Sequence, residues 1–311
     1  MGIRRAVAMG IAVCIAALAA ACANAPRQPA AAALAAPCPT GPTFASGADR
    51  ATLWMRNSSE YRAASETIFR AALESLKVGL ADPSWTAEPT QGGDLSGLPP
   101  AVIMDIDETV LDNSESQVRL LLQDTCFEEF PASWDAWVAE RRAPAVPGAV
   151  EFVLEARLLQ DPAGRNVRIF FITNRECENR PGNDAACPQE EDTAANLRVL
   201  GLGTEMLDEE LLFRGEQPAW DGEKLSRRQE IARGYRILLN VGDDLADFLP
   251  EVRRQTVAER DLARCARDAF WGRRWFLLPN PIYGSWLVAT GPDLAKSLAA
   301  EPAVLQTCPP P

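Results

Sequence analysis

Hydrophobic residues occur along this chain in two alternating patterns. Apolar positions at helical spacing predict a long helix over 49–81, whereas a nearly continuous apolar run, "NVRIFFIT" (166–173), is typical of a parallel strand buried on both faces. The other predicted elements are strands at 101–106, 211–213 and 235–244, and helices at 114–123, 147–160, 190–201, 223–233 and 251–270. Pro147 is expected at the first position of its helix. Strands that alternate with helices predict an α/β fold with a doubly wound parallel sheet.

Polar side chains occupy the ends of three predicted strands. The three segments read Asp105-Ile106-Asp107, Thr173-Asn174-Arg175 and Gly242-Asp243-Asp244. Ligands of doubly wound sheets bind beyond the carboxyl ends of the strands. The pattern therefore predicts one site, built where these three strand ends converge.

Composition and charge narrow the chemistry of that site. The 311 residues are 47% hydrophobic, which is enough for a full-sized core, and the formal net charge of −12 argues against binding to nucleic-acid polymers. The chain has no histidine, which excludes Ser-His-Asp catalysis and histidine-ligated metals. A metal bound by converging carboxylates must be a hard cation, and Mg²⁺ suits them best.

The N-terminus has the pattern of an export signal. Arg4 and Arg5 precede an apolar run over 6–21, and "LAAAC" ending at Cys22 is similar to a lipoprotein box. Cleavage after "ACA" (21–23) and a retained membrane anchor are the alternatives. We expect a signal peptide at 1–22, an Ala/Pro-rich linker at 23–43 and the folded domain at 44–311, in a protein that is periplasmic or attached to the outer membrane through lipid on Cys22.

Cysteine usage is consistent with export. Once Cys14 leaves with the signal and Cys22 carries lipid, six cysteines remain: Cys38, Cys126, Cys177, Cys187, Cys265 and Cys308. An even number in an exported chain predicts disulfides. We expect Cys177 with Cys187, which share one loop, then Cys38 with Cys308, which leaves Cys126 with Cys265.

The motifs resemble a known family. "DIDETVLDN" (105–113), "WDAWV" (134–138), "FFITNR" (170–175), "LLNVGDDLADF" (238–248) and "LPNPIYGSW" (278–286) occur in the order found in bacterial class C acid phosphatases of the haloacid dehalogenase (HAD) superfamily. Those enzymes are often surface lipoproteins. The resemblance extends from about Trp54 to Trp286, which is most of the chain after the linker.

The resemblance implies catalytic roles for five residues. Asp105 is expected to be the nucleophile that forms an aspartyl-phosphate, and Asp107 the general acid and then the general base. Thr173, with the backbone amide of Asn174, would bind the phosphoryl oxygens. Lys224 would neutralise the phosphate and hold Asp105, although without the other motifs it would be taken for an exposed helix lysine.

The resemblance also implies a Mg²⁺ site. Asp243, the Asp105 carboxylate and the Asp107 carbonyl are the expected ligands. Asp247 is expected to act behind them or through a water molecule. Glu108 receives no catalytic role and is expected to be structural.

Several residues have two interpretations. Asp112 and Asn113 either cap a turn or line the site. Tyr283 and Trp286 either form an apolar wall for a base or aryl leaving group or belong to the core. Arg175 is either a phosphate contact or a structural ion-pair partner.

Three positions depart from the family pattern. Asp244 replaces the usual Asn and adds negative charge near the metal, Ser116 stands where a Tyr of the substrate region is common, and Leu287 replaces an acid. None of the three belongs to the expected catalytic pair, so the departures bear on specificity rather than on the reaction.

Together these features predict an exported, Mg²⁺-dependent acid phosphatase that is most active below neutral pH. Its substrates would be small phosphate monoesters, with 5′-nucleotides and aryl phosphates as examples. A smaller helical accessory region is expected from 44–95 and 112–145, with the C-terminal end. Phosphotransfer to an alcohol acceptor is one alternative, and a non-enzymatic surface lipoprotein that keeps the fold is another. Relatives suggest a homodimer.

Overall fold

A computed structural model describes residues 48–122, 130–180, 182–291, 294–300 and 308. These residues belong to a compact unit formed by residues 40–311. The expected signal peptide, the linker and Cys22 lie outside the described residues. Within the described part of the chain, none of the helices has the length and apolar character needed to cross a membrane.

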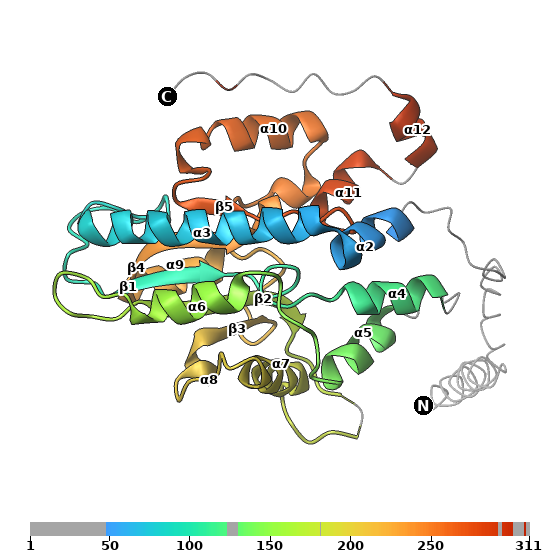
Figure 1. The fold of residues 1–311 in the computed structure, drawn as a ribbon, viewed down its shortest axis with the longest axis horizontal. Coiled ribbons are helices and arrows are strands. Elements are labelled where there is room, and N and C mark those ends of the chain that lie inside the picture. The colour runs from blue at the N-terminus through green and yellow to red at the C-terminus, as the bar shows by residue number, and fades with distance from the viewer. Residues whose placement is uncertain (1–47, 123–129, 181, 292–293, 301–307, 309–311) are drawn as a thin grey trace, which may run out of the picture. The chain divides into compact units, whose positions relative to one another are not determined.

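A five-stranded parallel sheet forms the centre of the fold (Figure 1). Its strands are β1 (Pro100–Met104), β2 (Arg168–Glu176), β3 (Leu211–Arg214), β4 (Arg236–Gly242) and β5 (Trp275–Leu277). The spatial order is β3-β2-β1-β4-β5. Strands β2, β1 and β4 are neighbours, so the three polar strand ends lie side by side at one edge of the sheet, as predicted. Strand β5 was not predicted, because three residues are too few to show a periodic pattern.

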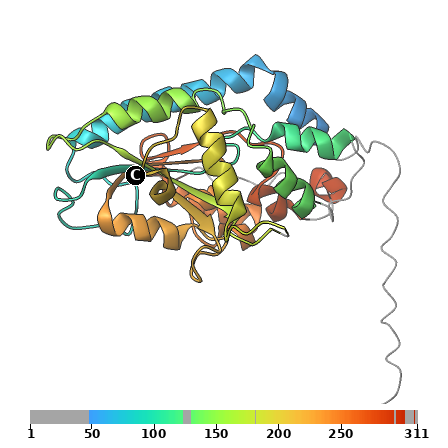
Figure 2. The same ribbon diagram turned by 90° about the horizontal axis from the view of Figure 1, so that it is seen from below.

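Alternate residues of β1 pack on opposite faces of the sheet. Val102 and Met104 belong to one hydrophobic cluster, and Ala101 and Ile103 to another. Helices α3 (Ser59–Ala81) and α6 (Ala149–Leu158) cover the first face, and α9 (Leu225–Gly234) covers the second (Figure 2). Both faces are therefore dry, which accounts for the nearly continuous apolar strands.

Three expected helices differ in the structure. The helix expected over 49–81 is two helices, α2 (Ala48–Asn57) and α3, because the Ser58 side chain accepts a hydrogen bond from the backbone of Tyr61 at 3.0 Å and starts a new helix. Helix α6 begins at Ala149, after Gly148 with φ +88°, so Pro147 is not its first residue. The helix expected over 251–270 is divided into η4 (Val252–Arg254), α10 (Val257–Cys265) and η5 (Asp268–Phe270).

Seven further helices complete the described part of the chain. These helices are α4 (Ser114–Leu122), α5 (Phe130–Ala139), α7 (Pro188–Val199), α8 (Leu207–Glu210), η3 (Leu245–Asp247), α11 (Ser285–Thr290) and α12 (Leu294–Ala299). Helices α4 and α5 lie beyond the carboxyl ends of the strands (Figure 1), where α2 packs against α4. Residues 59–81 were expected in the accessory region, but they form α3, which packs on the sheet as part of the core.

Candidate active site

Asp105 follows the last residue of β1 and is almost fully buried. Its backbone N–H still donates to the Val241 carbonyl of β4 at 2.9 Å, so the carboxylate is held where the sheet ends. The side chain is 7% exposed and forms an ion pair with Lys224. Lys224 is the residue before α9, is 4% exposed and also pairs with Asp247 at 2.7 Å. The interpretation of Lys224 as an exposed helix lysine is therefore wrong.

Three carboxylates converge beside Lys224. Oxygens of Asp105, Asp243 and Asp247 lie within 4.8 Å of one another. Burial raises the pKa of Asp105 to about 7, against the opposing charge of Lys224. Burial also raises the pKa of Asp243 well above its usual range, and the charges of Asp105 and Asp247 raise it further. When all four groups are ionised their charges sum to −2, so a divalent cation with oxygen ligands fits this donor set.

Asp243 and Asp247 have different surroundings. Asp243 accepts hydrogen bonds from Asn280 Nδ2 at 2.8 Å and from Thr109 Oγ1 at 3.4 Å. Asp247 Oδ2 accepts the backbone N–H groups of Asp243 and Asp244, at 3.1 and 3.0 Å, while its Oδ1 meets Lys224. Asp247 is thus bound by two backbone N–H groups and by Lys224, whereas Asp243 accepts hydrogen bonds from two neutral side chains. The place of Asp247 behind the metal ligands stays a prediction.

Gly242 is required at the end of β4 by the close approach of Asp247. A Cβ atom added to Gly242 would lie 2.3 Å from Asp247 Oδ2, inside any allowed contact. The glycine therefore lets the aspartate fold back over the strand end.

Asp107 lies in the turn after β1, and its side chain is held by three donors. Arg175 donates to Asp107 Oδ1 from Nε at 3.0 Å and from Nη2 at 2.8 Å. Asn113 Nδ2 donates to the same oxygen at 2.9 Å, and Thr173 Oγ1 donates to Oδ2 at 3.3 Å. Of the two interpretations of Arg175, the structure supports the ion pair.

Thr173 and Asn174 come from the carboxyl end of β2. Thr173 is fully buried, and its hydroxyl also accepts the backbone N–H of Arg175 at 3.0 Å. The Asn174 side chain donates to the Gly222 carbonyl at 3.1 Å and accepts from Arg227 at 2.8 Å. Its side chain therefore ties β2 to the segment that carries Lys224, which leaves the backbone amide as the expected phosphate contact.

Comparison with known proteins identifies the family of this arrangement. A family model described as HAD superfamily, subfamily IIIB (acid phosphatase) matches residues 43–286. The chain belongs to this family of acid phosphatases. The fold is similar to the solved class C acid phosphatase from Bacillus anthracis, and to the same protein with tungstate bound. Each match has 25% identity and a TM-score of 0.62, and covers 81% of this chain and 93% of the other.

The family assignment confirms three expectations. The phosphatase has the α/β fold that the alternation of strands and helices predicts, it is similar to class C enzymes, and it is a phosphomonoesterase. The interpretation as a non-enzymatic lipoprotein is set aside, because the match includes every segment that carries the expected catalytic residues.

Asp112 and Asn113 were each expected either to cap a turn or to line the site, and the structure gives them different roles. Asp112 accepts the Ser114 backbone N–H at 2.8 Å, which closes the turn before α4. Asn113 is fully buried and donates to Asp107, so it belongs to the site. Glu108 is buried with φ +57° and accepts the Asn113 backbone N–H at 2.8 Å, consistent with the expected structural role.

Asp244 is not one of the three converging carboxylates. Its carboxylate accepts hydrogen bonds from the hydroxyl and backbone N–H of Ser285 and from the Ala246 backbone N–H at 2.8 Å. Burial acts to raise its pKa, but these hydrogen bonds hold the pKa of Asp244 below its usual range. The departure from the family pattern is therefore accommodated by the start of α11.

The two aromatic residues expected at a leaving-group wall differ in position. Tyr283 is partly buried and packs against the larger hydrophobic cluster. Trp286 is 38% exposed and lines a cavity of about 310 Å³ together with Leu245 and with Val257 and Arg264 of α10. Among the described residues, neither Tyr283 nor Trp286 forms a hydrogen bond with the carboxylate cluster.

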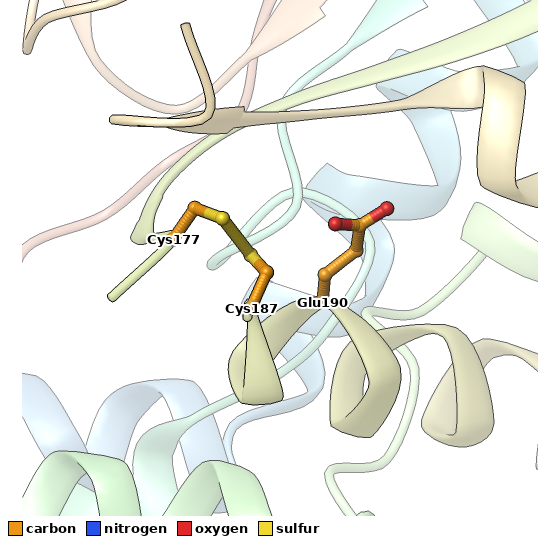
Figure 3. A group of neighbouring side chains, drawn as sticks. All are labelled: Cys177, Cys187 and Glu190. Atoms are coloured by element: carbon orange, nitrogen blue, oxygen red, sulfur yellow. A yellow bond between two sulfur atoms is a disulfide. The ribbon is translucent and has the colours of Figure 1, made fainter. Parts of the chain in front are cut away.

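A second group of potential metal ligands includes Cys177, which directly follows the carboxyl end of β2. Cys177, Cys187 and Glu190 lie close together (Figure 3), but the two sulfur atoms form a disulfide and have no thiolate to offer. The pairing of Cys177 with Cys187 is thus confirmed. Cys265 pairs with Cys308, so the expected partners of both residues were wrong.

The pairing was predicted wrongly because it depends on the tertiary structure. Cys265 ends α10, and its Cα atom lies 4.9 Å from that of Cys308, a proximity that sequence spacing does not encode. The expected partners, Cys38 and Cys126, lie outside the described residues.

Two residues of the site were missed from the sequence. Asn280, which contacts Asp243, follows β5, so missing that strand also concealed the residue. Arg227 is fully buried on α9 and donates to the Thr173 carbonyl and to Asn174, which fixes β2 against α9. The available signals were an Asn between two prolines and a second basic residue three positions after Lys224.

Proposed function

We propose that this phosphatase hydrolyses small phosphate monoesters through an aspartyl-phosphate on Asp105. The observation that supports this most is the buried ion pair of Asp105 with Lys224, set among two further carboxylates at the carboxyl end of the sheet. Lys224 and a bound cation would offset the charge of an approaching phosphate. Without that compensation, a carboxylate would repel its substrate.

The reaction has two steps. In the first, an Asp105 oxygen attacks phosphorus, the bond from phosphorus to the ester oxygen breaks, and Asp107 gives its proton to the leaving oxygen. In the second, water attacks the phosphorus of the intermediate while Asp107 takes a proton from it. The bond to Asp105 then breaks, which releases inorganic phosphate and restores both carboxyl groups.

The metal is proposed to be Mg²⁺. Asp105 and Asp243 would hold it, with the Asp107 carbonyl as a third ligand and Asp247 behind them. When bound, the cation supplies positive charge that neutralises the phosphoryl oxygens. Activity should be lost in EDTA and should return on addition of Mg²⁺, whereas full activity after exhaustive chelation would contradict the assignment.

The substrates are proposed to be small, with 5′-nucleotides and aryl phosphates as the first to test, at a pH below neutral. Two features of the sequence, the export signal and the even number of remaining cysteines, support a periplasmic or outer-membrane location. Mass spectrometry of the mature N-terminus would show whether Cys22 carries lipid. The oligomeric state, proposed to be a homodimer, is measured by light scattering.

The nucleophile is tested by replacing Asp105 with Asn. Turnover of an aryl phosphate should fall by at least about 10⁴-fold, because the amide cannot form the intermediate. Asp161→Asn is the matched control: its carboxylate is also buried, yet it lies in the turn before β2 and accepts from Arg165 and Ala163. Near-normal turnover of the Asp105 variant would refute the proposal.

A further inference from the structure

Helix α5 contacts two of the three residues that hold the Asp107 carboxylate, Asn113 and Arg175. Asp107 Oδ1 accepts hydrogen bonds from Asn113 and Arg175. Each of those donors meets a tryptophan of α5, Asn113 meeting Trp137 and Arg175 meeting Trp134. We propose that Trp137 is a positioning residue, which fixes the orientation of Asp107 through Asn113 and together with Arg175. The inference rests on the acid–base role proposed for Asp107.

Trp137 makes the shortest contact that orients the oxygen of the Asn113 amide. The indole N–H of Trp137 donates to Asn113 Oδ1 at 2.9 Å, and both side chains are at least 98% buried. An indole N–H is a donor only, so the amide must present its oxygen to Trp137 and its nitrogen to Asp107. Without the indole donor, the amide loses the shortest contact on its oxygen. A longer contact from Arg175 Nη2 at 3.5 Å and the donation from the amide nitrogen to the Leu111 carbonyl at 3.3 Å still oppose a turn of the oxygen toward Asp107.

Trp134 lies against the guanidinium group that grips the same carboxylate. The Arg175 guanidinium carbon is 5.5 Å from the centre of the Trp134 ring. The remaining nitrogen of the guanidinium group, Arg175 Nη1, donates to Thr193 Oγ1 at 2.7 Å. That hydroxyl in turn donates to the Gln189 carbonyl at 2.6 Å. Arg175 is 3% exposed, so its two donors reach Asp107 in one fixed orientation.

Helix α5 is itself firmly held. The guanidinium groups of Arg119 and Arg142 lie 5.1 and 5.3 Å from the centre of the Trp137 ring. Asp135, also on α5, pairs with Arg180 at 2.6 Å, and Arg180 reaches Asp192 of α7 at 2.8 Å. A helix of the accessory region is thus connected rigidly to a carboxylate of the core.

The consequence for the reaction depends on the leaving group. An alkoxide needs a proton from Asp107 as it departs, whereas 4-nitrophenolate is stable enough to leave without one. The ratio kcat/KM reports only the steps up to the departure of the leaving group. Misplacing Asp107 should therefore lower kcat/KM for an alkyl phosphate and leave the value for 4-nitrophenyl phosphate nearly unchanged.

The test compares these two substrates in four variants. Trp137→Phe removes the indole donor and keeps an aromatic ring, and Arg175→Gln removes the guanidinium. Trp85→Phe is the matched control, because Trp85 is equally buried and loses a hydrogen bond of 2.8 Å to the Leu238 carbonyl, a residue within β4. Asp107→Asn gives the full effect of losing the carboxylate.

We expect kcat/KM for the alkyl phosphate to fall about tenfold in Trp137→Phe and about a hundredfold in Arg175→Gln. For 4-nitrophenyl phosphate it should change less than about threefold in both, while Trp85→Phe affects the two substrates equally. Equal losses on both substrates in Trp137→Phe and Arg175→Gln, or no loss in Trp137→Phe, would overturn the positioning role. If Asp107→Asn itself affects both substrates equally, the proposed acid–base role fails, and the inference fails with it.

Discussion

Replacing Asp105 with Asn should stabilise the metal-free phosphatase at pH 8 while it abolishes turnover. Burial raises the pKa of Asp105 from 3.8 to about 7. Between these values the folded protein retains a proton that the unfolded chain has lost, so the free energy of unfolding falls as the pH rises. Each pH unit contributes about 1.4 kcal/mol, and ionised Asp105 therefore costs about 4 kcal/mol at pH 8. An Asn removes this cost and can still accept a hydrogen bond from Lys224.

The assay is urea unfolding in EDTA, with the disulfides intact, at pH 8 and pH 4. The variant should be the more stable protein at pH 8 by up to about 4 kcal/mol, and the difference should nearly vanish at pH 4, where Asp105 is protonated when folded. Added Mg²⁺ at pH 8 should narrow the gap, because the wild type gains the free energy of binding.

Asp161→Asn is a control for which we expect the opposite change in the free energy of unfolding. Although burial acts to raise the pKa of Asp161, hydrogen bonds from Arg165 hold it below its usual range. That variant should therefore be less stable than the wild type at pH 8. If Asp105→Asn is also destabilised at pH 8, by the same amount as at pH 4, the electrostatic account of the carboxylate cluster is wrong.

Three further changes have defined outcomes. Replacing Cys177 and Cys187 together with Ser opens a link across ten residues and should lower the free energy of unfolding by about 3 kcal/mol in denaturant titrations. Asn280→Ala should raise the half-saturating Mg²⁺ concentration about tenfold, with kcat at saturating metal nearly retained; an unchanged metal titration would show that the amide has no part in metal binding. Burial and the charge of Glu216 raise the pKa of Glu190 to about 7, so Glu190→Gln should raise the melting temperature at pH 8 and leave it unchanged at pH 4; equal shifts at both values would refute this.

The sequence predicts the sheet and the convergence of its polar ends because both depend on local patterns. A nearly continuous apolar strand followed by polar residues is recognisable without tertiary information, as at Asp105, Thr173 and Asp243. Parallel strands then bring their carboxyl ends to one edge. The structure adds that Lys224 is buried and shared between two of the acids.

The remaining features depend on contacts between distant residues, which a single sequence does not specify. Asn280 reaches Asp243 only because a three-residue strand pairs beside β4. Trp137 reaches Asn113 only because α5 folds over the end of the sheet. The pairing of Cys265 with Cys308 joins residues that are 43 positions apart in the sequence, and the break at Ser58 depends on a single capping hydrogen bond.

The central claim is that Asp105 carries the phosphoryl group, and the Asp107→Asn variant tests it most directly. With 4-nitrophenyl phosphate the first step needs no proton from residue 107, whereas hydrolysis of the intermediate does need the base. The variant should release about one equivalent of 4-nitrophenol rapidly. Mass spectrometry after an acid quench should then locate a phosphoryl group on Asp105. A stoichiometric burst with the phosphoryl group on another residue, or unhindered turnover with no phosphorylated peptide, would contradict the account.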